Sequence, residues 1–429
     1  PRALVVETAD APAIDGPPPT PRRSGGAPGR ISTPHPDAVA AELQRARDLL
    51  PGMNPPPALL LESALDGLPG QPASLRRLLA ALGAPGLAED SGTPPTLSRS
   101  LPDPDARLKR QFDQLMEHTQ RLMRESPQQR AVFWTKADAS SPEAWKASTT
   151  PLREYLWDEV IGRFPEPMEI MHPRSRLMTE TPAYSAYEIM LNVYPEVFAY
   201  GILLVPKDIR SGERRPVVVC QHGLEGRPNL IADPRVNDPT YIQYGCRLAE
   251  RGYVVYAPQN PYIGGDAFRV IQRKANPLRK SLFAVIVRQH QQTLRWLAAL
   301  PFVDADRIAF YGLSYGGKTA MRVPALLDGY CLSICSADFN EWIWKNVSNS
   351  SPYSYLFTGE YEMPEFNLGN TFNYAELSWL ILPRPFMVER GHHDGVAPDE
   401  WVAYEFARTR RQYVVLGIGD YAEIAYFDG

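Results

Sequence analysis

The 429-residue chain lacks several features that would assign a protein to a class at once. It has only four cysteines, too few for a disulfide scaffold and too widely spaced for a CxxC zinc site. We therefore expect reduced thiols, which slightly favours a cytoplasmic over a secreted protein. No run of about 18 apolar residues occurs, so we expect no membrane-spanning helix and no membrane partner. A net charge of −4 argues against a dedicated nucleic-acid-binding protein.

The chain does have enough apolar material for a large core, because 44% of its residues are hydrophobic. Its prolines are unevenly distributed, and 20 of the 43 lie within residues 1–105. Proline lacks a backbone N–H and fixes φ, so it disfavours helix interiors and sheets. We predict that residues 1–102 are a largely disordered tail, in which helices near Ala38–Leu50 and Leu75–Leu82 are transient or weakly docked. The alternative is a tether or a partner-binding tail.

A helical lead-in is predicted over residues 103–183. Asp103-Pro104-Asp105 is a typical helix start, with Asp as the N-cap and Pro in the first turn. Apolar residues then recur with the 3.6-residue period over residues 108–123. Ser141-Pro142-Glu143 repeats the start signal, and Pro151 begins a further helix. We expect these helices to pack on the domain that follows.

From residue 184 onward, short β-branched or aromatic runs alternate with helical stretches. The runs that we predict as strands are Tyr187–Val193, Ala199–Val205, Val217–Cys220, Val254–Ala257, Arg307–Tyr311, Leu332–Ser336, Phe386–Glu389 and Glu423–Phe427. The first two suit an antiparallel pair, whereas helix-length segments separate the other six. This alternation predicts an α/β domain over residues 184–429, with a mostly parallel eight-stranded sheet that helices cover on both faces.

The strongest chemical signal is the sequence Gly312-Leu313-Ser314-Tyr315-Gly316-Gly317, which lies between a predicted strand and a helical stretch. A nucleophilic serine needs a tight turn that projects its oxygen above the sheet, and flanking glycines let the backbone pass closely. The helix N-terminus places amide donors where negative charge develops. We predict Ser314 as a nucleophile, and the alternative is an ordinary serine in a glycine-rich turn.

A second turn follows the strand Val217–Cys220, with the sequence Gln221-His222-Gly223-Leu224. The glycine allows the backbone to direct an amide toward the nucleophile. We predict that the amides of Leu224 and Tyr315 form an oxyanion hole. His222 is a candidate for the substrate pocket or the catalytic base, although its place before the glycine suits a role in loop structure better.

Residues 390–398, with the sequence Arg-Gly-His-His-Asp-Gly-Val-Ala-Pro, follow the strand Phe386–Glu389. The order of strands, HG, GxSxGG and GxxDxxxP over residues 184–429 resembles the α/β-hydrolase superfamily. Within it, the chain is most similar to the branch of dienelactone hydrolases, acetyl xylan esterases and prolyl oligopeptidase-like enzymes. The resemblance implies that Asp394 is the acid that orients a catalytic histidine. Glu389, at the strand end, is the alternative acid.

The family pattern also places a histidine after the last strand, but no histidine follows His393 in this sequence. The chain begins with Pro1 and shows no signal-peptide pattern. We therefore expect truncation at both ends, with the catalytic base beyond Gly429. His392 and His393 lie beside Asp394, but without spaced partner ligands they favour a solvated or loop-packing role over a metal site.

Substrate signals lie in residues 337–382, an expected lid-like insert between two strands. Its aromatic and amide side chains could cradle a sugar or an aryl ester, or the aromatics could simply be core. Trp342 and Trp344 are the candidate pocket residues. Lys318 stands four residues after Ser314, a spacing that resembles glucuronoyl esterases. Those enzymes carry an arginine directly after the serine, where this chain has Tyr315, which favours a solvent-exposed helix residue for Lys318.

The sequence therefore predicts a serine hydrolase that cleaves a carboxylic ester through an acyl-enzyme. The substrate would be an acyl ester of a carbohydrate or of another small molecule, and no metal or organic cofactor is expected. One alternative is a peptidase of the same fold, although the first 180 residues lack the blade repeat typical of such enzymes. The other alternative is a binding protein that has lost its base.

Overall fold

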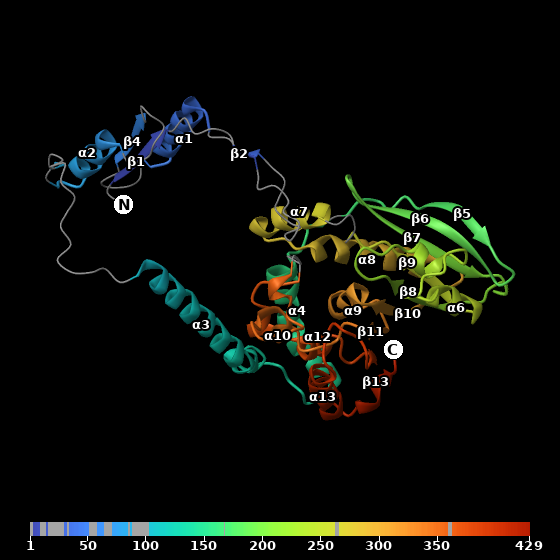
Figure 1. The fold of residues 1–429 in the computed structure, drawn as a ribbon. Coiled ribbons are helices and arrows are strands. Elements are labelled where there is room, and N and C mark those ends of the chain that lie inside the picture. Colours follow the sequence, from blue (N-terminus) through green and yellow to red (C-terminus); the bar gives the residue numbers. More distant parts are fainter. Residues whose placement is uncertain are drawn as a thin grey trace. The chain divides into compact units, whose positions relative to one another are not determined.

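The computed structural model describes most of the chain (Figure 1). The described residues are 3–8, 14–15, 30–31, 34–50, 58–63, 71–84, 86–87, 103–166, 168–261, 266–358 and 363–429. The chain divides into two compact units, Pro1–Leu108 and Lys109–Gly429.

The first unit combines short strands with two helices. Its elements are β1 (Ala3–Thr8), β2 (Ile14–Asp15), β3 (Arg30–Ile31), α1 (Pro36–Asp48), β4 (Ala58–Ser63) and α2 (Pro72–Ala81). The helices coincide with the two predicted helical stretches. The parallel pairing of β1 with β4 was not predicted, because each strand is a single short apolar run among prolines. Much of the predicted disordered tail, which includes residues 16–29, 51–57 and 88–102, lies outside the described residues.

The predicted lead-in contains α3 (Pro104–Phe133), α4 (Pro142–Tyr155) and the π-helical turn η1 (Leu156–Ile161). The Ser141 hydroxyl caps α4 by accepting a 3.0 Å hydrogen bond from the amide of Ala144. The helical part ends earlier than residue 183, because β5 (Arg174–Glu180) belongs to the sheet.

The second unit is built on a nine-stranded sheet of the described residues, with the order β13-β12-β11-β10-β8-β9-β7-β6-β5. Its strands after β5 are β6 (Tyr184–Tyr194), β7 (Val197–Pro206), β8 (Arg215–Gln221), β9 (Val254–Pro258), β10 (Val303–Leu313), β11 (Leu332–Ser336), β12 (Phe386–Gly391) and β13 (Ala422–Phe427). All eight predicted strands are therefore confirmed.

The sheet is mixed rather than uniformly parallel. The six strands from β13 to β9 pair in parallel, whereas β9, β7, β6 and β5 pair antiparallel. The expected antiparallel pair is β6 and β7. The prediction of eight strands was one too few, because the edge strand β5 is largely exposed and polar and therefore shows no apolar run. A cross-strand ion pair between Arg176 and Glu188 joins it to β6.

Helices cover both faces of the sheet (Figure 1). The helices outside the insert are α5 (Asn229–Ala232), α6 (Tyr244–Glu250), α7 (Asp266–Ala275), α8 (Leu282–Ala299), α9 (Tyr315–Leu326), α13 (Asp399–Val415) and the short η2 (Asn276–Leu278) and η4 (Gly419–Tyr421). Alternate residues of β8 enter two cores. Val217 and Val219 pack with α8 and α9, whereas Val218 and Cys220 pack with α5 and α6. No helix of the described residues is long and apolar enough to span a membrane.

Residues 337–382, which we call the insert, connect β11 to β12 through α10 (Trp342–Val347), η3 (Tyr355–Phe357), α11 (Leu368–Thr371) and α12 (Tyr374–Trp379). Helices α3 and α4 hold the insert by hydrogen bonds to its backbone. Side chains of these two helices, and of Trp134 directly after α3, donate to five of its carbonyl groups. The pairs are Gln120 to Val347, Arg130 to Gly369, Trp134 to Thr371, Trp145 to Trp379, and Arg153 to Leu380. The second half of α3 and helix α4 therefore pack on the insert. The predicted apolar stripe of α3 does not, because Leu108, Phe112, Leu115 and Leu122 are exposed.

Candidate active site

Ser314 lies at the junction between β10 and α9, in the strand–turn–helix arrangement that the sequence predicts. Its backbone has φ 58° and ψ −119°, a conformation that non-glycine residues rarely adopt. Two backbone hydrogen bonds hold the turn: the Ser314 amide donates to the Ser336 carbonyl, and the Lys318 amide donates to the Ser314 carbonyl, each at 2.9 Å. This conformation is a local strain that the surrounding sheet and helix maintain.

The glycines around Ser314 are required by close backbone approach. A Cβ atom on Gly312 would lie 1.9 Å from the carbonyl oxygen of Gly316. A Cβ atom on Gly316 would lie 2.2 Å from the carbonyl oxygen of Gln221, at the end of β8. The turn is therefore pressed against the loop that follows β8.

That loop lies directly beside the serine. A Cβ atom on Gly223 would be 3.0 Å from the Cβ of Ser314, and the Gly223 amide donates a 2.8 Å hydrogen bond to the Tyr241 hydroxyl. Leu224 is the next residue, and Tyr315 is the first residue of α9. The two candidate oxyanion donors thus belong to the two segments that meet at Ser314.

His222 is engaged in the structure of this loop. Its Nδ1 lies 2.8 Å from the Gly223 carbonyl oxygen, and its Nε2 lies 3.0 Å from the amide nitrogen of Asn260. These contacts fit a neutral ring that donates through Nδ1 and accepts at Nε2. Burial lowers the pKa of His222 to about 4. Both ring nitrogens are occupied, which agrees with the loop role rather than with a catalytic base.

The carboxylate of Asp394 is held from two sides in the loop after β12, residues 391–398, which we call the acid loop. Its Oδ1 accepts a 3.1 Å hydrogen bond from the Val396 amide, and its Oδ2 lies 3.1 Å from Nη1 of Arg390. The buried Arg390 guanidinium also donates to the Ala397 carbonyl and pairs with Asp399. The orientation of Asp394 is therefore well defined.

The end of the last strand, β13, lies next to the acid loop. The His393 amide donates a 3.2 Å hydrogen bond to the carbonyl oxygen of Gly429. A Cβ atom on Gly391 would lie 2.0 Å from that oxygen. Gly429 therefore contacts the acid loop.

Glu389 has a different neighbour. Its carboxylate accepts a 2.7 Å hydrogen bond from the hydroxyl of Tyr311, whose pKa is raised by burial and by this carboxylate. Tyr311 packs with Tyr244 on the α6 side of the sheet. The alternative acid is thus engaged with a core tyrosine.

The two neighbouring histidines differ. Both are exposed, but His392 also lies 2.7 Å from the Asp399 carboxylate and stacks on Tyr426. Within the part of the chain that the structure describes, no group of three or more His, Cys, Asp or Glu side chains is arranged to hold a metal ion.

The prediction that Lys318 is solvent-exposed was wrong, because its side chain is completely buried. Its Nζ lies 5.4–5.5 Å from the ring centroids of Phe283, Tyr315 and Trp342. Three aromatic faces can stabilise a desolvated ammonium group by cation–π attraction. One turn later the buried Arg322 pairs with Glu365. The first two turns of α9 therefore place two cations behind Ser314, which helix periodicity alone did not indicate.

The two candidate tryptophans of the insert lie in different environments. Trp342 is buried and stacks on Tyr374 at 4.9 Å, so it belongs to the core. Trp344 is 39% exposed. The buried Phe372 and Tyr374 also favour the core interpretation for most of the aromatic residues of the insert.

Sequence reasoning missed Asp338, which comes two residues after β11. A Cβ atom on Gly317 would lie 2.7 Å from its Cβ, and the Tyr374 hydroxyl donates to its carboxylate. Burial raises the pKa of Asp338 to about 6. The signal that could have found it is an acidic residue just beyond a strand that neighbours the nucleophile strand, at the sheet edge where carboxyl ends of parallel strands meet.

Comparison with known proteins decides the fold. No family model matches the chain. A solved structure from Bacteroides fragilis NCTC 9343, named a "putative acetyl xylan esterase", matches with a TM-score of 0.54 at 19% sequence identity, over 70% of this chain and 80% of that one. This chain has the α/β-hydrolase fold. The predicted fold class is thereby confirmed, whereas an identity this low carries no activity from one protein to the other.

Two of the curated proteins that share sequence with this chain are also hydrolases by name. Dipeptidyl peptidase 8 of Homo sapiens is 25% identical over 170 residues, which are 37% of this chain and 18% of that protein. "Putative hydrolase YtaP" of Bacillus subtilis (strain 168) is 25% identical over 195 residues, which are 44% of this chain and 63% of that protein. The matched regions thus span less than two thirds of either relative.

Proposed function

We propose that this α/β-hydrolase is a serine esterase that hydrolyses carboxylic esters of small molecules, including acylated sugars. The observation that carries the proposal is the strained turn at Ser314, which lies directly against the loop of Gly223 and Leu224. This close approach is possible because Gly316 and Gly223 have no Cβ atoms. A serine with a strained φ of 58° between a strand and a helix is typical of a nucleophile that must project from the sheet.

In the proposed mechanism, Ser314 Oγ attacks the ester carbonyl while a histidine removes its proton. The amides of Leu224 and Tyr315 would stabilise the tetrahedral oxyanion, each by about 3 kcal/mol. The histidine then protonates the departing alcohol as the C–O bond breaks, which leaves an acyl-serine. Water attacks this ester by the same route, releases the acid and regenerates Ser314.

Asp394 is proposed as the acid that orients the histidine, because its carboxylate is fixed and the end of β13 contacts its loop. The histidine is proposed to follow Gly429 in the full-length gene product. Glu389 is less suited, since Tyr311 already occupies its carboxylate.

A fluorophosphonate probe tests the proposal on both the 429-residue chain and the full-length gene product. We expect Ser314 to be labelled in the longer protein only, as located by peptide mass spectrometry, and Ser314→Ala to abolish labelling. Absence of labelling in both, with both folded, would contradict the enzymatic proposal and favour a binding protein.

Substrate class is tested on the full-length product. We expect turnover of p-nitrophenyl acetate and of acetylated sugars, with little turnover of dipeptidyl p-nitroanilides. Preferential cleavage of the dipeptidyl substrates would favour the peptidase alternative, to which the similarity with dipeptidyl peptidase 8 points. Cleavage of aryl esters without cleavage of acetylated sugars would contradict the carbohydrate part alone.

A further inference from the structure

Lys345, on helix α10 of the insert, is a buried lysine whose environment is unusual. It is 1% exposed, yet it forms no ion pair with a carboxylate of the residues that the structure describes. Its Nζ donates to the carbonyl oxygens of Val396 and Tyr353 and lies 4.1 Å from the ring centroid of Tyr355. Burying an ammonium group without an ion pair is costly, so a structural reason for it is needed.

Val396 connects this lysine to the candidate acid. Its carbonyl oxygen accepts from Lys345, while its amide donates the 3.1 Å hydrogen bond to Oδ1 of Asp394. Arg390 holds the other carboxylate oxygen and the Ala397 carbonyl. The acid loop is thus fixed by two buried cations: Arg390 comes from its own strand, and Lys345 comes from the insert.

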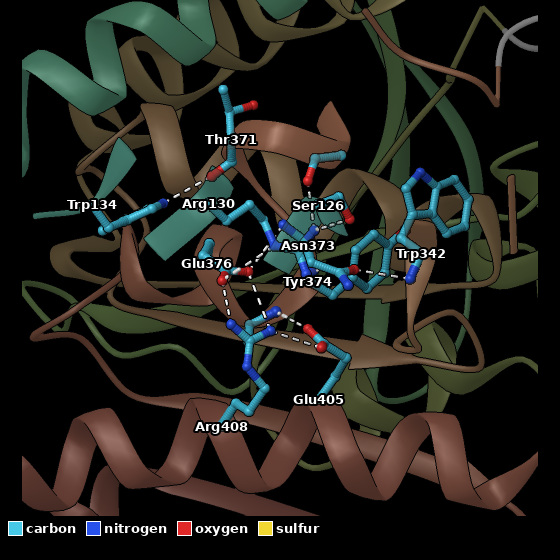
Figure 2. Close-up of polar contacts among 12 residues, drawn as sticks. Ser126, Arg130, Trp134, Trp342, Thr371, Asn373, Tyr374, Glu376, Glu405 and Arg408 are labelled. Carbon is cyan, nitrogen blue, oxygen red and sulfur yellow. Dashed lines mark hydrogen bonds and ion pairs between the residues drawn. The ribbon is translucent and has the colours of Figure 1, made fainter. Parts of the chain in front are cut away.

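The far end of α10 is fixed as well, in a buried polar network (Figure 2). The carboxylate of Glu341 caps α10 by accepting from the Trp344 amide, and it also accepts from the side-chain amide of Asn373. Asn373 in turn accepts from the Trp342 amide at 2.9 Å. Helix α10 therefore cannot shift without breaking contacts at its first turn.

The same network reaches helices α3 and α13. The Asn373 amide donates to Glu376, whose carboxylate pairs with Arg130 of α3 and Arg408 of α13 (Figure 2). Arg408 also pairs with the buried Glu405. Helix α10, which carries Lys345, is therefore tied to α12, α3 and α13, which lie outside the acid loop.

We propose that Lys345 is a positioning residue that sets the orientation of the Asp394 carboxylate through Val396. The insert then takes part in catalysis by aligning the acid. This inference rests on the proposed function, because it requires Asp394 to act as the acid. Burial lowers the pKa of Lys345 to about 8, and the nearby Arg390 lowers it further. Asp338 and Asp394 oppose this decrease and therefore favour a charged lysine at this buried position.

The test uses the full-length gene product and p-nitrophenyl acetate. Lys345→Met removes the ammonium group with little change in volume. The matched control is Lys280→Met, because Lys280 also donates to a backbone carbonyl, that of Arg163, and lies 5.6 Å from the Phe164 ring centroid. We expect Lys345→Met to lower kcat about 10- to 100-fold with KM within about twofold, as misplacement of a catalytic group does.

Two further readouts separate positioning from folding. Lys345→Arg should recover kcat to within about fivefold of the parent. The acid limb of the kcat/KM profile should move to higher pH in Lys345→Met, because a buried positive charge near Asp394, which would orient the histidine, has been removed. Lys280→Met should change neither quantity.

A folded Lys345→Met with parental kcat and an unmoved pH profile would overturn the inference. If Lys345→Met does not fold, Lys345→Gln, which retains an amide donor but no charge, is judged by the same two quantities. Asp394→Asn separates this failure from that of the proposed function: parental activity in Asp394→Asn would remove the acid assignment itself. An inactive Asp394→Asn together with a fully active Lys345→Met would remove only the role of Lys345.

Discussion

The turn at Ser314 and the buried polar network around Glu376 are held in place by different physical interactions. At the turn, backbone lies against backbone: Gly316 has no space for a Cβ, and Ser314 adopts a strained φ of 58°. In the network, ionisable side chains from α3, α12 and α13 pair with one another in largely buried positions (Figure 2). The first region should therefore be sensitive to added volume, and the second to a change in charge or protonation.

Added volume at the turn should have the largest effect. Gly316→Ala would place a Cβ 2.2 Å from the Gln221 carbonyl oxygen, and backbone cannot move aside as a flexible side chain can. Alanine normally stabilises a helix relative to glycine by about 1 kcal/mol, but here we expect a loss of about 3 kcal/mol or more. Urea denaturation followed by circular dichroism measures the change.

The matched control for this prediction is Gly395→Ala in the acid loop. Nothing lies within 4 Å of a Cβ built on Gly395. Its stability should stay within about 0.5 kcal/mol of the parent. Equal stability of Gly316→Ala and Gly395→Ala would contradict the steric account of the turn.

Removal of one charge from the network should be nearly as damaging. Arg130→Met leaves the buried Glu376 with Arg408 as its remaining cation and also removes donors to Ser126 and Gly369. We expect a loss of about 3 kcal/mol, the lower end of the usual cost of breaking a buried ion pair, because Arg408 still pairs with Glu376. The measurement is the urea midpoint at pH 7.

Arg121→Met provides the comparison for that effect. Arg121 lies on the same helix α3, but its ion pair with Glu125 is exposed on both sides. Exposed pairs contribute little, so a loss of about 0–1 kcal/mol is expected. A similarly small loss for Arg130→Met would show that the network is not a stabilising feature of the native state.

The protonation of the network should make stability fall as pH rises. Burial raises the pKa of Glu405 to about 8 and that of Glu341 to about 7, whereas an unfolded glutamate titrates near about 4.3. Between these values the folded state binds more protons than the unfolded state. Stability from these groups is therefore complete below about pH 4 and decreases toward pH 8, by at most about 1.4 kcal/mol per pH unit for each group.

Other groups also titrate over this range, so the informative quantity is a difference between variants. Glu405→Gln carries no ionisable group and should flatten the decrease in unfolding free energy between pH 5 and pH 8. Glu400→Gln, at an exposed site on the first turn of the same helix α13, should keep the parental slope. Parallel slopes for all three proteins would contradict protonation of Glu405 in the folded state.

The contrast between the two regions also explains what the sequence could and could not predict. The turn is encoded within a few consecutive residues, so the motif around Ser314 indicated its place between a strand and a helix. The eight predicted strands were visible as apolar runs for the same reason. The edge strand β5 was missed, because an exposed strand with residues such as Arg174 and Arg176 has no apolar pattern.

The network was invisible in the sequence for a different reason. Arg130 and Glu376 are separated by more than half of the chain, and neither forms a recognisable local pattern with its neighbours. Lys318 and Lys345 were likewise indistinguishable from surface lysines, because burial of a charge depends on aromatic rings and carbonyls that only the fold brings together. Long-range electrostatic partners thus required the structure.

The smallest predicted effect concerns the N-cap of α4. This cap is encoded by a few consecutive residues, yet it stabilises a helix that contacts the insert. Ser141 was recognised from sequence as an N-cap, and its hydroxyl accepts from the Ala144 amide at 3.0 Å. Ser141→Ala should cost about 1 kcal/mol, whereas Ser141→Thr, which retains the hydroxyl, should cost less than about 0.5 kcal/mol. Helix α4 carries Trp145, which donates to the Trp379 carbonyl at the end of α12. Hydrogen exchange in Ser141→Ala should therefore increase at the amides of α12 as well as α4, and an increase confined to α4 would mean that the lead-in does not hold the insert.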